Sequence, residues 1–429
     1  MIASEISPFA KTGGLADVLG TLSVALERFS HEVCVIAPAY RAVLQGNFPL
    51  QDTGISLTAP IAGRSIPASV LKAAIGMGVE VYFIRANEYF DREALYGTAA
   101  GDYPDNAERF VFFSRAALEL LCRYPVDLVH GHDWQAAPAV IFLKTQAGRY
   151  REIAAAKTVF TIHNLGFQGI FPPAQWSLLN LDPALFTPQF LEFYGNINFL
   201  KGALLMADKI TTVSPSYAQE LMTPEQGFGL DGVLSQRAAD IVGILNGVDY
   251  GQWNPWTDPL LTHHFGEHSL SIKTQCKSSL QREVGLADDG NRPLIAMISR
   301  LTLQKGIDLV ESAFPSLIER DIQFVLLGSG EPRFEEFFRS AARRYPGRVA
   351  VRIDFDEALA HRIEAGADFF LMPSLYDPCG LNQMYSLKYG TIPIVRAVGG
   401  LKDTVEDYDA DKQSGTGFVV TSHTPQALV

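Results

Sequence analysis

The chain has 429 residues, more than one ordinary domain holds, so we expect two domains. Hydrophobic residues make up 47% of the sequence and charged residues 19%, a composition typical of globular proteins with a substantial core. The formal net charge is −12, and lysines and arginines form no block. This excludes the charge pattern that nucleic acids and anionic membranes attract, so neither is expected as a partner.

The four cysteines lie far apart and form no CxxC pair. Their spacing argues against a disulfide framework and against a zinc site, and is typical of proteins from a reducing compartment. No apolar run reaches the length of a membrane-spanning helix, and the N-terminus lacks the layout of a signal peptide. We therefore expect a cytoplasmic protein.

The first half alternates short apolar segments with helical patterns. Residues 1–4 are a very short apolar piece, residues 15–29 show helical spacing, and residues 40–74 are expected to be irregular or to carry a hairpin. Strands separated by helices pair in parallel, so a parallel sheet is expected. The further expected strands are residues 32–37, 79–85, 126–130, 157–163, 209–213 and 241–245, and the expected helices are residues 107–124, 135–147, 198–207 and 215–222.

Residues 249–269 differ from the rest, because they are rich in Trp, Pro and His and show little periodicity. We interpret them as the connection between two domains. Beyond them strands are expected at residues 294–299, 323–327, 348–353, 369–372, 392–395 and 417–420, with helices between. Both halves, residues 1–246 and residues 247–429, are therefore predicted to be doubly wound α/β domains. Ligands in such folds bind beyond the carboxyl ends of the strands.

Residues 372–383 carry the most informative pattern, a strand followed by a loop and a helix. Pro378 and Gly380 fix the turn, and backbone amides at the helix start form an anion-binding site. Asp377 stands just before these amides. A carboxylate beside an anion-binding helix end suits a ligand with hydroxyl groups and phosphates, such as a nucleotide sugar. The alternative is that Asp377 only caps the helix.

Two other strand-to-helix loops carry cations. Lys11 precedes Gly13 and Gly14, which offers an ammonium group and bare amides to a diphosphate, although a plain tight turn is the alternative. Arg300 and Lys305 bracket the loop of residues 299–306. Arginine holds phosphate through two N–H groups and lysine adds a mobile charge, but a solvated surface pair would look the same in the sequence.

The remaining motifs are weaker. His163 ends an apolar strand, where it could bond a sugar hydroxyl or be structural. His130 and His132 stand beside Asp133 without a third ligand at matching spacing, so zinc is not expected. Residues 354–356, 407–409 and 409–411 match the DxD pattern of metal-dependent sugar transfer and are interpreted as surface acids. No complete dinucleotide fingerprint and no G-x-S-x-G elbow occur, which argues against a dehydrogenase and a serine hydrolase.

Taken together, these segments resemble one family, the bacterial glycogen synthases and plant starch synthases, from about Ser4 to the end of the chain. The resemblance is specific because many motifs match in the same order. They are residues 11–18 (KTGGLADV), 130–134 (HGHDW), 161–165 (TIHNL), 212–215 (TVSP), 227–232 (GFGLDG), 246–249 (NGVD), 299–302 (SRLT), 304–306 (QKG), 378–381 (PCGL) with Gln383, 399–401 (GGL) and 403–405 (DTV).

The resemblance implies a GT-B architecture, which is two Rossmann-like domains with the site in the cleft. It implies transfer of glucose from ADP-glucose or UDP-glucose to the non-reducing end of an α-1,4-glucan, with retention of configuration and no metal or other cofactor. Lys11, Arg300 and Lys305 would stabilise the charge on the departing nucleotide. The implied catalytic residues are Lys11, His163, Arg300, Lys305 and Asp377. The implied substrate-binding residues are Gly13, Gly14, Asp17, Asn164, Asn246, Cys379, Gly380, Leu381, Gly399 and Gly400.

The chain departs from the family pattern at Asp377, where the family usually has glutamate. Aspartate is shorter by one methylene, so its oxygens fall back by roughly 1.5 Å. A misplacement of about 1 Å can cost on the order of 100-fold in rate, so we expect weak activity unless the loop shifts. The family also begins a few residues earlier and continues with helical sequence beyond Val429, so we expect a C-terminal domain that is truncated.

Three readings remain open on the sequence alone. The first is the synthase, in the cytoplasm or, in a plant, in the plastid, although no transit peptide is seen. The second is a related nucleotide-sugar transferase with another acceptor, chosen by the aromatic loops of residues 89–103 and 165–186. The third is a glucan-binding or assembly protein that has lost turnover. The partners expected are a nucleotide sugar and an α-glucan, and the sequence leaves the base of the donor and the oligomeric state open.

Overall fold

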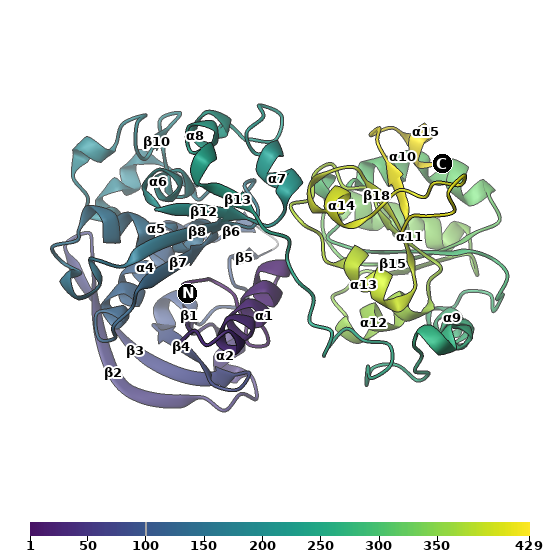
Figure 1. The fold of residues 1–429 in the computed structure, drawn as a ribbon, viewed down its shortest axis with the longest axis horizontal. Coiled ribbons are helices and arrows are strands. Elements are labelled where there is room, and N and C mark those ends of the chain that lie inside the picture. Colours follow the sequence, from purple (N-terminus) through teal and green to yellow (C-terminus); the bar gives the residue numbers. More distant parts are fainter. Residues whose placement is uncertain (99–100) are drawn as a thin grey trace. The chain divides into compact units, whose positions relative to one another are not determined.

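The computed structural model describes residues 1–98 and 101–429 and shows two compact units (Figure 1). Unit 1 is Met1–Val213 with Ala218–Gly247, and unit 2 is Ser214–Tyr217 with Val248–Val429. Residues 99–100 lie outside the described residues, so they leave the predicted loop of residues 89–103 incomplete. Among the helices of the described residues, none is long and apolar enough to cross a membrane.

Unit 1 contains two four-stranded sheets that Ile2 links, because Ile2 forms a parallel bridge to Ile36 in one sheet and to Gly131 in the other. The very short apolar piece at residues 1–4 is therefore a bridge rather than a full strand. The first sheet has the order β13-β12-β8-β7 and is parallel. Its strands are β7 (Leu128–His132), β8 (Lys157–Ile162), β12 (Lys209–Thr212) and β13 (Ile241–Gly243).

The second sheet of unit 1 has the order β1-β4-β3-β2, in which β1 and β4 are parallel and the other pairs antiparallel. Its strands are β1 (Cys34–Pro38), β2 (Gln51–Ile61), β3 (Arg64–Ile75) and β4 (Val79–Arg85). The β2–β3 pair is the hairpin that the Gly- and Pro-rich residues 40–74 suggested, curved along the lower left of Figure 1.

Helices and short strands complete unit 1. The helix α5 is buried along nearly its whole length, which explains why its apolar residues show little one-sided pattern. The helices are α1 (Gly14–Arg28), α2 (Arg41–Gln45), α3 (Asn87–Phe90), α4 (Asn106–Leu121), α5 (Asp133–Thr145), α6 (Phe199–Met206) and α8 (Asp231–Gln236), while α7 (Pro215–Glu220) crosses the boundary between the units. The short strands are β5 (Gly97–Thr98), β6 (Gly101–Asp102), β9 (Ile170–Phe171), β10 (Glu192–Phe193) and β11 (Asn196–Asn198).

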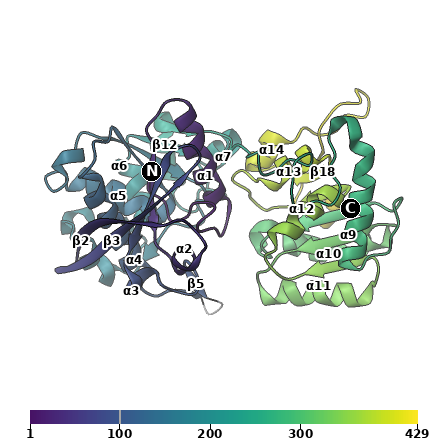
Figure 2. The same cartoon turned by 90° about the horizontal axis from the view of Figure 1, so that it is seen from below.

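Unit 2 is built on one parallel six-stranded sheet with the order β16-β15-β14-β17-β18-β19 (Figure 2). Its strands are apolar on both faces because helices cover both. The strands are β14 (Leu294–Ile298), β15 (Gln323–Leu327), β16 (Val349–Arg352), β17 (Phe369–Met372), β18 (Ile392–Arg396) and β19 (Phe418–Val420). The helices are α9 (Lys273–Val284), α10 (Ile307–Glu319), α11 (Pro332–Arg344), α12 (Glu357–Gly366), α13 (Asn382–Tyr389), α14 (Gly399–Thr404) and α15 (Pro425–Leu428).

The strand order of unit 2 reverses direction between β14 and β17. From β14 the chain moves outward through β15 to β16, and then returns to β17 on the other side of β14. A doubly wound sheet binds its ligands at such a switch point, outside the carboxyl ends of the strands. The loops after β14 and β17, which carry the predicted donor residues, therefore lie at the expected ligand edge.

Residues 249–269, which we interpreted from the sequence as the connection between two domains, directly follow the boundary between the units and pack in the core of unit 2. The ring of Trp253 is stacked between those of His361 and Tyr385, at centroid distances of 3.7 and 3.8 Å. The buried carboxylate of Asp258 accepts hydrogen bonds from Tyr389 and from Nδ1 of His361. Periodicity identifies regular elements, and this segment is buried without forming one.

Candidate active site

At the switch point of unit 2, Lys305 and Asp377 form an ion pair. Nζ of Lys305 lies 2.6 Å from Oδ2 of Asp377, which also accepts a 3.1 Å hydrogen bond from Oγ of Ser374. Asp377 is only 3% exposed. The helix α13, which follows, has no side-chain cap. The alternative reading of Asp377 as a helix cap is therefore wrong, and its carboxylate instead holds the lysine of the neighbouring loop.

The two loops at this edge are joined by further contacts. Nη2 of Arg300 donates to Oε1 of Gln304 at 3.1 Å, and the backbone carbonyl of Gln304 accepts from the amide of Leu375 at 2.9 Å. At Gly306, φ is +68° and a Cβ would lie 2.1 Å from the carbonyl oxygen of Pro373, so only glycine permits this approach. Arg300 and Lys305 are thereby placed beside the loop that carries Asp377.

The start of α14 packs against the same loop, backbone to backbone. The amide of Gly400 donates to the carbonyls of Asp377 and Pro378 at 3.3 and 3.2 Å. A Cβ at Gly399, where φ is +43°, would lie 1.9 Å from the carbonyl oxygen of Asp377. A Cβ at Gly400 would lie 2.4 Å from Cα of Cys379. The structure therefore brings together the donor candidates Arg300, Lys305, Asp377, Cys379, Gly380, Leu381, Gly399 and Gly400.

Two side chains of α13 fix the backbone of this loop and of its neighbour by hydrogen bonds. Nε2 of Gln383 donates to the carbonyl of Cys379 at 2.9 Å and to Oγ1 of Thr404 at 3.0 Å. Nδ2 of Asn382 donates to the carbonyl of Ile298, at the end of β14, at 3.0 Å. Gly380 adopts a φ of +69°, which directs the chain into the helix. The loop therefore has a defined shape before any ligand binds.

In unit 1, Lys11 precedes the start of α1, as predicted. Its Nζ lies 2.8 Å from Oδ1 of Asp17, so two of the candidates pair with each other. The helix begins at Gly14 with Gly13 as N-cap and without a side-chain cap, which leaves backbone amides at its start. Thr12 is fixed by Glu5, whose two oxygens each lie 2.6 Å from a Thr12 donor, the amide and Oγ1.

The candidates His163 and Asn164 lie side by side at the carboxyl end of β8. Oδ1 of Asp133 accepts from their backbone amides at 2.7 and 3.4 Å. Asp133 has a φ of +56°, which is unusual for a residue other than glycine. Burial is the main cause that raises the pKa of its carboxyl group to about 7. Such strained, desolvated carboxylates are concentrated at functional sites.

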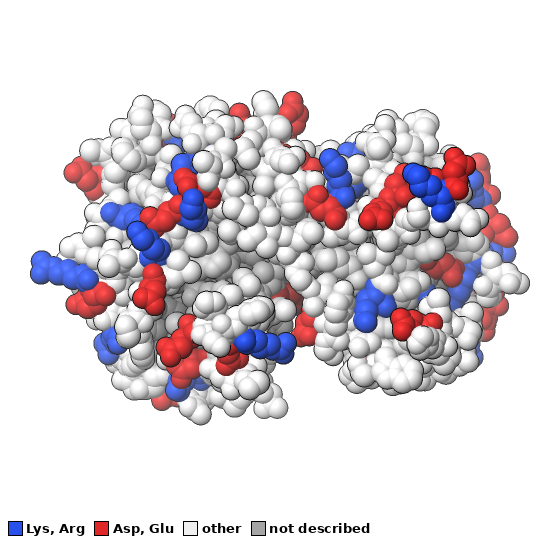
Figure 3. All heavy atoms as spheres, viewed as in Figure 1, with Lys and Arg blue, Asp and Glu red and all other residues white. Residues whose placement is uncertain are grey.

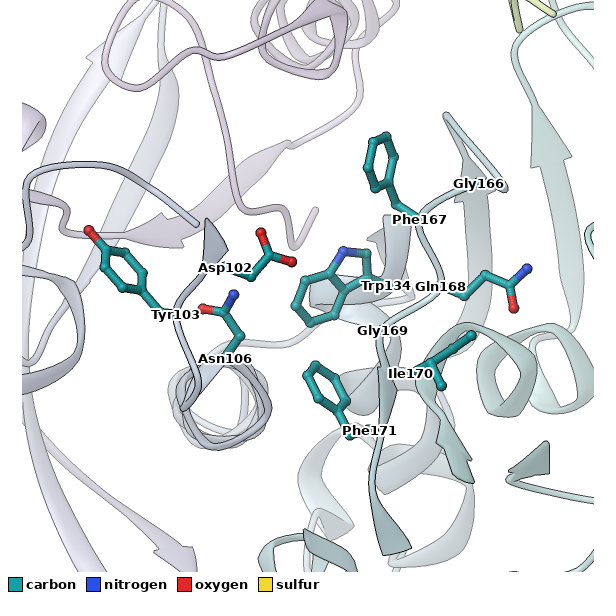
Figure 4. Close-up of a pocket in the computed structure, with 10 residues that line it drawn as sticks. All are labelled: Asp102, Tyr103, Asn106, Trp134, Gly166, Phe167, Gln168, Gly169, Ile170 and Phe171. Carbon is teal, nitrogen blue, oxygen red and sulfur yellow. The ribbon is translucent and has the colours of Figure 1, made fainter. Parts of the chain in front are cut away.

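A cavity of about 250 Å³ lies near these residues, between the start of α4, the start of α5 and residues 166–171 (Figure 4). In this view Asp102 and Asn106 lie to the left of Trp134, Phe167 lies above it and Phe171 below it. Aromatic surfaces with a few polar groups are typical of a small-molecule site. The lining residues are Asp102, Tyr103, Asn106, Trp134, Gly166, Phe167, Gln168, Gly169, Ile170 and Phe171.

Several residues of these clusters were not among the predicted site residues. They include Glu5, Asp133 and Ser374, and the aromatic residues of the cavity. The motif HGHDW contained a signal for Asp133 and Trp134, but the spacing alone did not show that Asp133 reaches the amides after β8. Asn246 follows β13, and in residues 1–98 and 101–429 its side chain has no hydrogen bond to another candidate.

The DxD segments have structural roles in unit 2. Asp356 caps α12 by accepting from the amide of Leu359 at 2.8 Å. Asp409 accepts from the amides of Asp411 and Lys412 and so closes a turn. These contacts agree with their interpretation as surface acids. On the face shown in Figure 3, acidic and basic side chains are interspersed in both units and form no basic stripe.

Two family models match the chain, one in each half. Residues 1–236 match "Starch synthase catalytic domain", and residues 281–429 match "Glycosyl transferases group 1". Together they include nearly all of the candidates named above. The first match alone covers more than half of the chain.

Similar proteins agree with these models. The chain is 48% identical to the glycogen synthase of Anaeromyxobacter dehalogenans strain 2CP-C and 47% identical to that of Koribacter versatilis, over its whole length and 89% and 88% of theirs. Among solved structures, it resembles the catalytic domain of starch synthase IV from Arabidopsis thaliana bound to ADP and acarbose, at a TM-score of 0.92 and 35% identity. That match covers 100% of this chain and 89% of the other.

A more distant likeness concerns the fold alone. Sucrose-phosphate synthase from Thermosynechococcus elongatus matches at a TM-score of 0.58 and 17% identity, over 100% of this chain and 86% of that one. The fold expected from the sequence, two Rossmann-like units of the GT-B class, is confirmed by the starch synthase match. The chain belongs to the glycogen synthase and starch synthase family of glycosyltransferases.

Proposed function

We propose that the chain transfers glucose from ADP-glucose to the non-reducing end of an α-1,4-glucan and retains the configuration at the anomeric carbon. The observation that carries this proposal is the ion pair between Lys305 and the buried carboxylate of Asp377 at the switch point of unit 2. A cation held in place beside a glycine-lined loop suits a sugar diphosphate. The matched starch synthase IV was solved with ADP, which supports an adenine nucleotide as the donor.

Unit 2 binds the sugar nucleotide that donates the glucose. When the bond between C1 of glucose and the phosphate oxygen breaks, negative charge grows on the departing ADP. Arg300 and Lys305 stabilise that charge through their side-chain N–H groups. The acceptor hydroxyl forms the new bond to C1, and its proton leaves with the phosphate. Lys11 and Gly14, at the start of α1, remain predicted phosphate ligands.

Unit 1 binds the glucan that accepts the glucose. The cavity around Trp134 offers flat aromatic surfaces, with the carboxylate of Asp102 nearby. Sugar rings present apolar faces and hydroxyl rims, which such a lining accommodates. The acarbose bound to starch synthase IV supports a glucan-like ligand. His163 and Asn164 complete the predicted glucose site.

We further propose that transfer needs no divalent metal and takes place in the cytoplasm. Lysine and arginine side chains neutralise the charges that a metal would otherwise neutralise, and the DxD segments form a helix cap and a turn. A transfer rate that is unchanged in excess EDTA would support the metal-free reaction, and a rate restored only by Mg²⁺ would contradict it.

The compartment is a separate point: all four cysteines are free, which supports a reducing compartment.

The test of the proposed function is a transfer assay with purified protein and glycogen. ADP-glucose and UDP-glucose are supplied in separate reactions, and nucleotide release and incorporation of labelled glucose are both measured. We expect incorporation and stoichiometric ADP release with ADP-glucose, and much slower transfer with UDP-glucose. Binding of glycogen without release of either nucleotide would contradict an enzyme and favour a glucan-binding protein. Release without incorporation would indicate another acceptor.

A further inference from the structure

A short segment from the first half of the chain belongs to unit 2. Ser214–Tyr217 lies in unit 2, although the residues before and after it belong to unit 1. The segment includes the end of the motif TVSP (residues 212–215), which takes no part in the contacts described above. Within unit 2 it contacts the loop of residues 377–380 and the helix α14. It therefore reaches the place where the donor candidates gather.

The side chain of Ser214 is fully buried and makes two hydrogen bonds. Its Oγ accepts from the backbone amide of Tyr217 at 3.1 Å and donates to the carbonyl oxygen of Pro378 at 2.7 Å. A backbone amide can only donate, so the hydroxyl proton of Ser214 is directed to the carbonyl. Ser214 thus holds the loop at the residue that directly follows Asp377.

This hydrogen bond fixes the direction of one peptide group in the loop. The carbonyl of Pro378 also accepts from the amide of Gly400 at 3.2 Å. The carbonyl of Cys379 accepts from Nε2 of Gln383 at 2.9 Å. In a planar trans peptide group the N–H points away from the carbonyl. Ser214 therefore determines which way the peptide group between Pro378 and Cys379 faces.

Ser216 binds the helix that packs on this loop. Its amide and its Oγ donate to Oδ2 and Oδ1 of Asp403, at 2.8 and 2.6 Å. Asp403 lies near the end of α14, whose first residues pack against the loop. Hydrogen bonds to an ionised carboxylate are shorter and stronger than bonds between neutral groups. The segment therefore holds both the loop and the helix beside it.

We propose that Ser214 is a positioning residue for the sugar nucleotide. Through the carbonyl of Pro378 it keeps the loop of residues 377–380 in its binding conformation before the donor arrives, and the contact of Ser216 with Asp403 keeps α14 against that loop. This inference rests on the proposed function, in which the loop holds the donor. Less binding free energy is lost when a loop is already ordered, so loss of the anchor should weaken nucleotide binding and leave glucan binding unchanged.

The test replaces Ser214 by threonine and by valine, which have nearly the same shape and differ in the hydroxyl group. Calorimetry with ADP gives Kd, and steady-state kinetics give KM for ADP-glucose and for glycogen. We expect Kd for ADP and KM for ADP-glucose to be about 3- to 10-fold higher in Ser214→Val than in Ser214→Thr. KM for glycogen should be equal in the two variants.

The control is Ser23→Ala, which removes another buried serine hydroxyl that donates to a backbone carbonyl, within α1. It should keep the wild-type Kd for ADP and the wild-type KM values. A second variant, Ser216→Ala, lies at a half-buried position and covers the case in which substitutions at Ser214 prevent folding. It removes one of the two donors to Asp403 and should raise Kd for ADP about 2- to 10-fold.

Equal values of Kd for ADP in Ser214→Thr and Ser214→Val would overturn the inference. If neither variant folds, a wild-type Kd in Ser216→Ala would overturn it. A rise in KM for glycogen as large as that for ADP-glucose would also overturn it, because general loss of structure would then explain both. Kd for ADP is measured without turnover, so glucose transfer by the wild-type chain would leave the proposed function standing in each of these cases.

Discussion

Nζ of Lys305 lies 2.6 Å from Oδ2 of Asp377, although 72 residues separate them in the chain. The carboxylate is nearly buried and has Ser374 as its other side-chain partner. Asp377 thus controls where the lysine charge stands, whether or not it also touches the sugar. This relationship makes Asp377 the first residue to test.

We expect Asp377→Asn to lower kcat about 100-fold or more, because it removes the charge that holds Lys305 beside the donor. Asp377→Glu should raise kcat above that of the wild-type chain, because it restores the roughly 1.5 Å of reach that the aspartate lacks. Steady-state kinetics with ADP-glucose measure both. If Asp377→Glu gives no gain, the loop already compensates for the shorter side chain.

Lys305→Met should lower kcat on the order of 100- to 1,000-fold, because it removes a charge that stabilises the leaving diphosphate. It should also lower the thermal midpoint, since it leaves the Asp377 carboxylate buried without its cation. The matched control is Lys412→Met, which breaks an exposed ion pair with Asp409 and should change neither quantity. Wild-type kcat in Lys305→Met would remove Lys305 from the donor site.

The glycines of the two predicted phosphate loops should respond differently to alanine. Gly399→Ala places a Cβ within 1.9 Å of a carbonyl oxygen, so we expect loss of transfer and a lower thermal midpoint. Gly13→Ala meets nothing within 4 Å, so the fold should keep its thermal midpoint. We expect a higher KM for ADP-glucose in Gly13→Ala, because the methyl group blocks the approach of phosphate to the amides. The control is Gly148→Ala, whose Cβ also meets nothing within 4 Å, and it should change neither the thermal midpoint nor KM for ADP-glucose.

Phe167 tests the acceptor cavity, because it is 50% exposed and therefore costs little stability when it is truncated. Phe167→Ala should raise KM for glycogen about 2- to 10-fold and leave KM for ADP-glucose unchanged. The control Phe29→Ala removes another exposed ring, at the end of α1, and should affect neither constant. A rise in KM for ADP-glucose alone would place Phe167 on the donor side.

Glu364 makes the stability of unit 2 depend on pH. It is buried in α12, where Oγ of Ser386 donates to it at 2.7 Å, and burial raises the pKa of its carboxyl group from 4.5 to about 8. Between these values the unfolded chain has lost the proton and the folded chain keeps it. The free energy of unfolding therefore falls as pH rises through this window, by on the order of 5 kcal/mol in total.

Glu364→Gln should remove this loss, because its amide oxygen can still accept from Ser386. The thermal midpoint of the variant should exceed that of the wild-type chain by a margin that grows between about pH 5 and pH 8. Glu267→Gln, at an exposed position, is the control and should show no such trend. A constant difference across the range would mean that Glu364 is ionised in the folded chain.

Local patterns in the amino-acid sequence were enough to identify the regular elements and the family. Apolar strands alternating with helical patterns identified a parallel α/β organisation in each half, and the ordered motifs identified glycogen and starch synthases. Such information is local, because the pattern that predicts a strand or a helix lies within a few neighbouring residues. The predictions for the loops after β14 and β17 were of this kind, since each loop directly follows the carboxyl end of a predicted strand.

Which of these residues contact one another became visible in the folded chain. It paired Lys305 with Asp377 and Lys11 with Asp17, brought Asp133 to the amides after β8, and set His132 against His163. It also showed that the irregular residues around Trp253 belong to the core of unit 2. Contacts between residues far apart in the chain depend on strand register and on how loops fold back, and no local pattern records either.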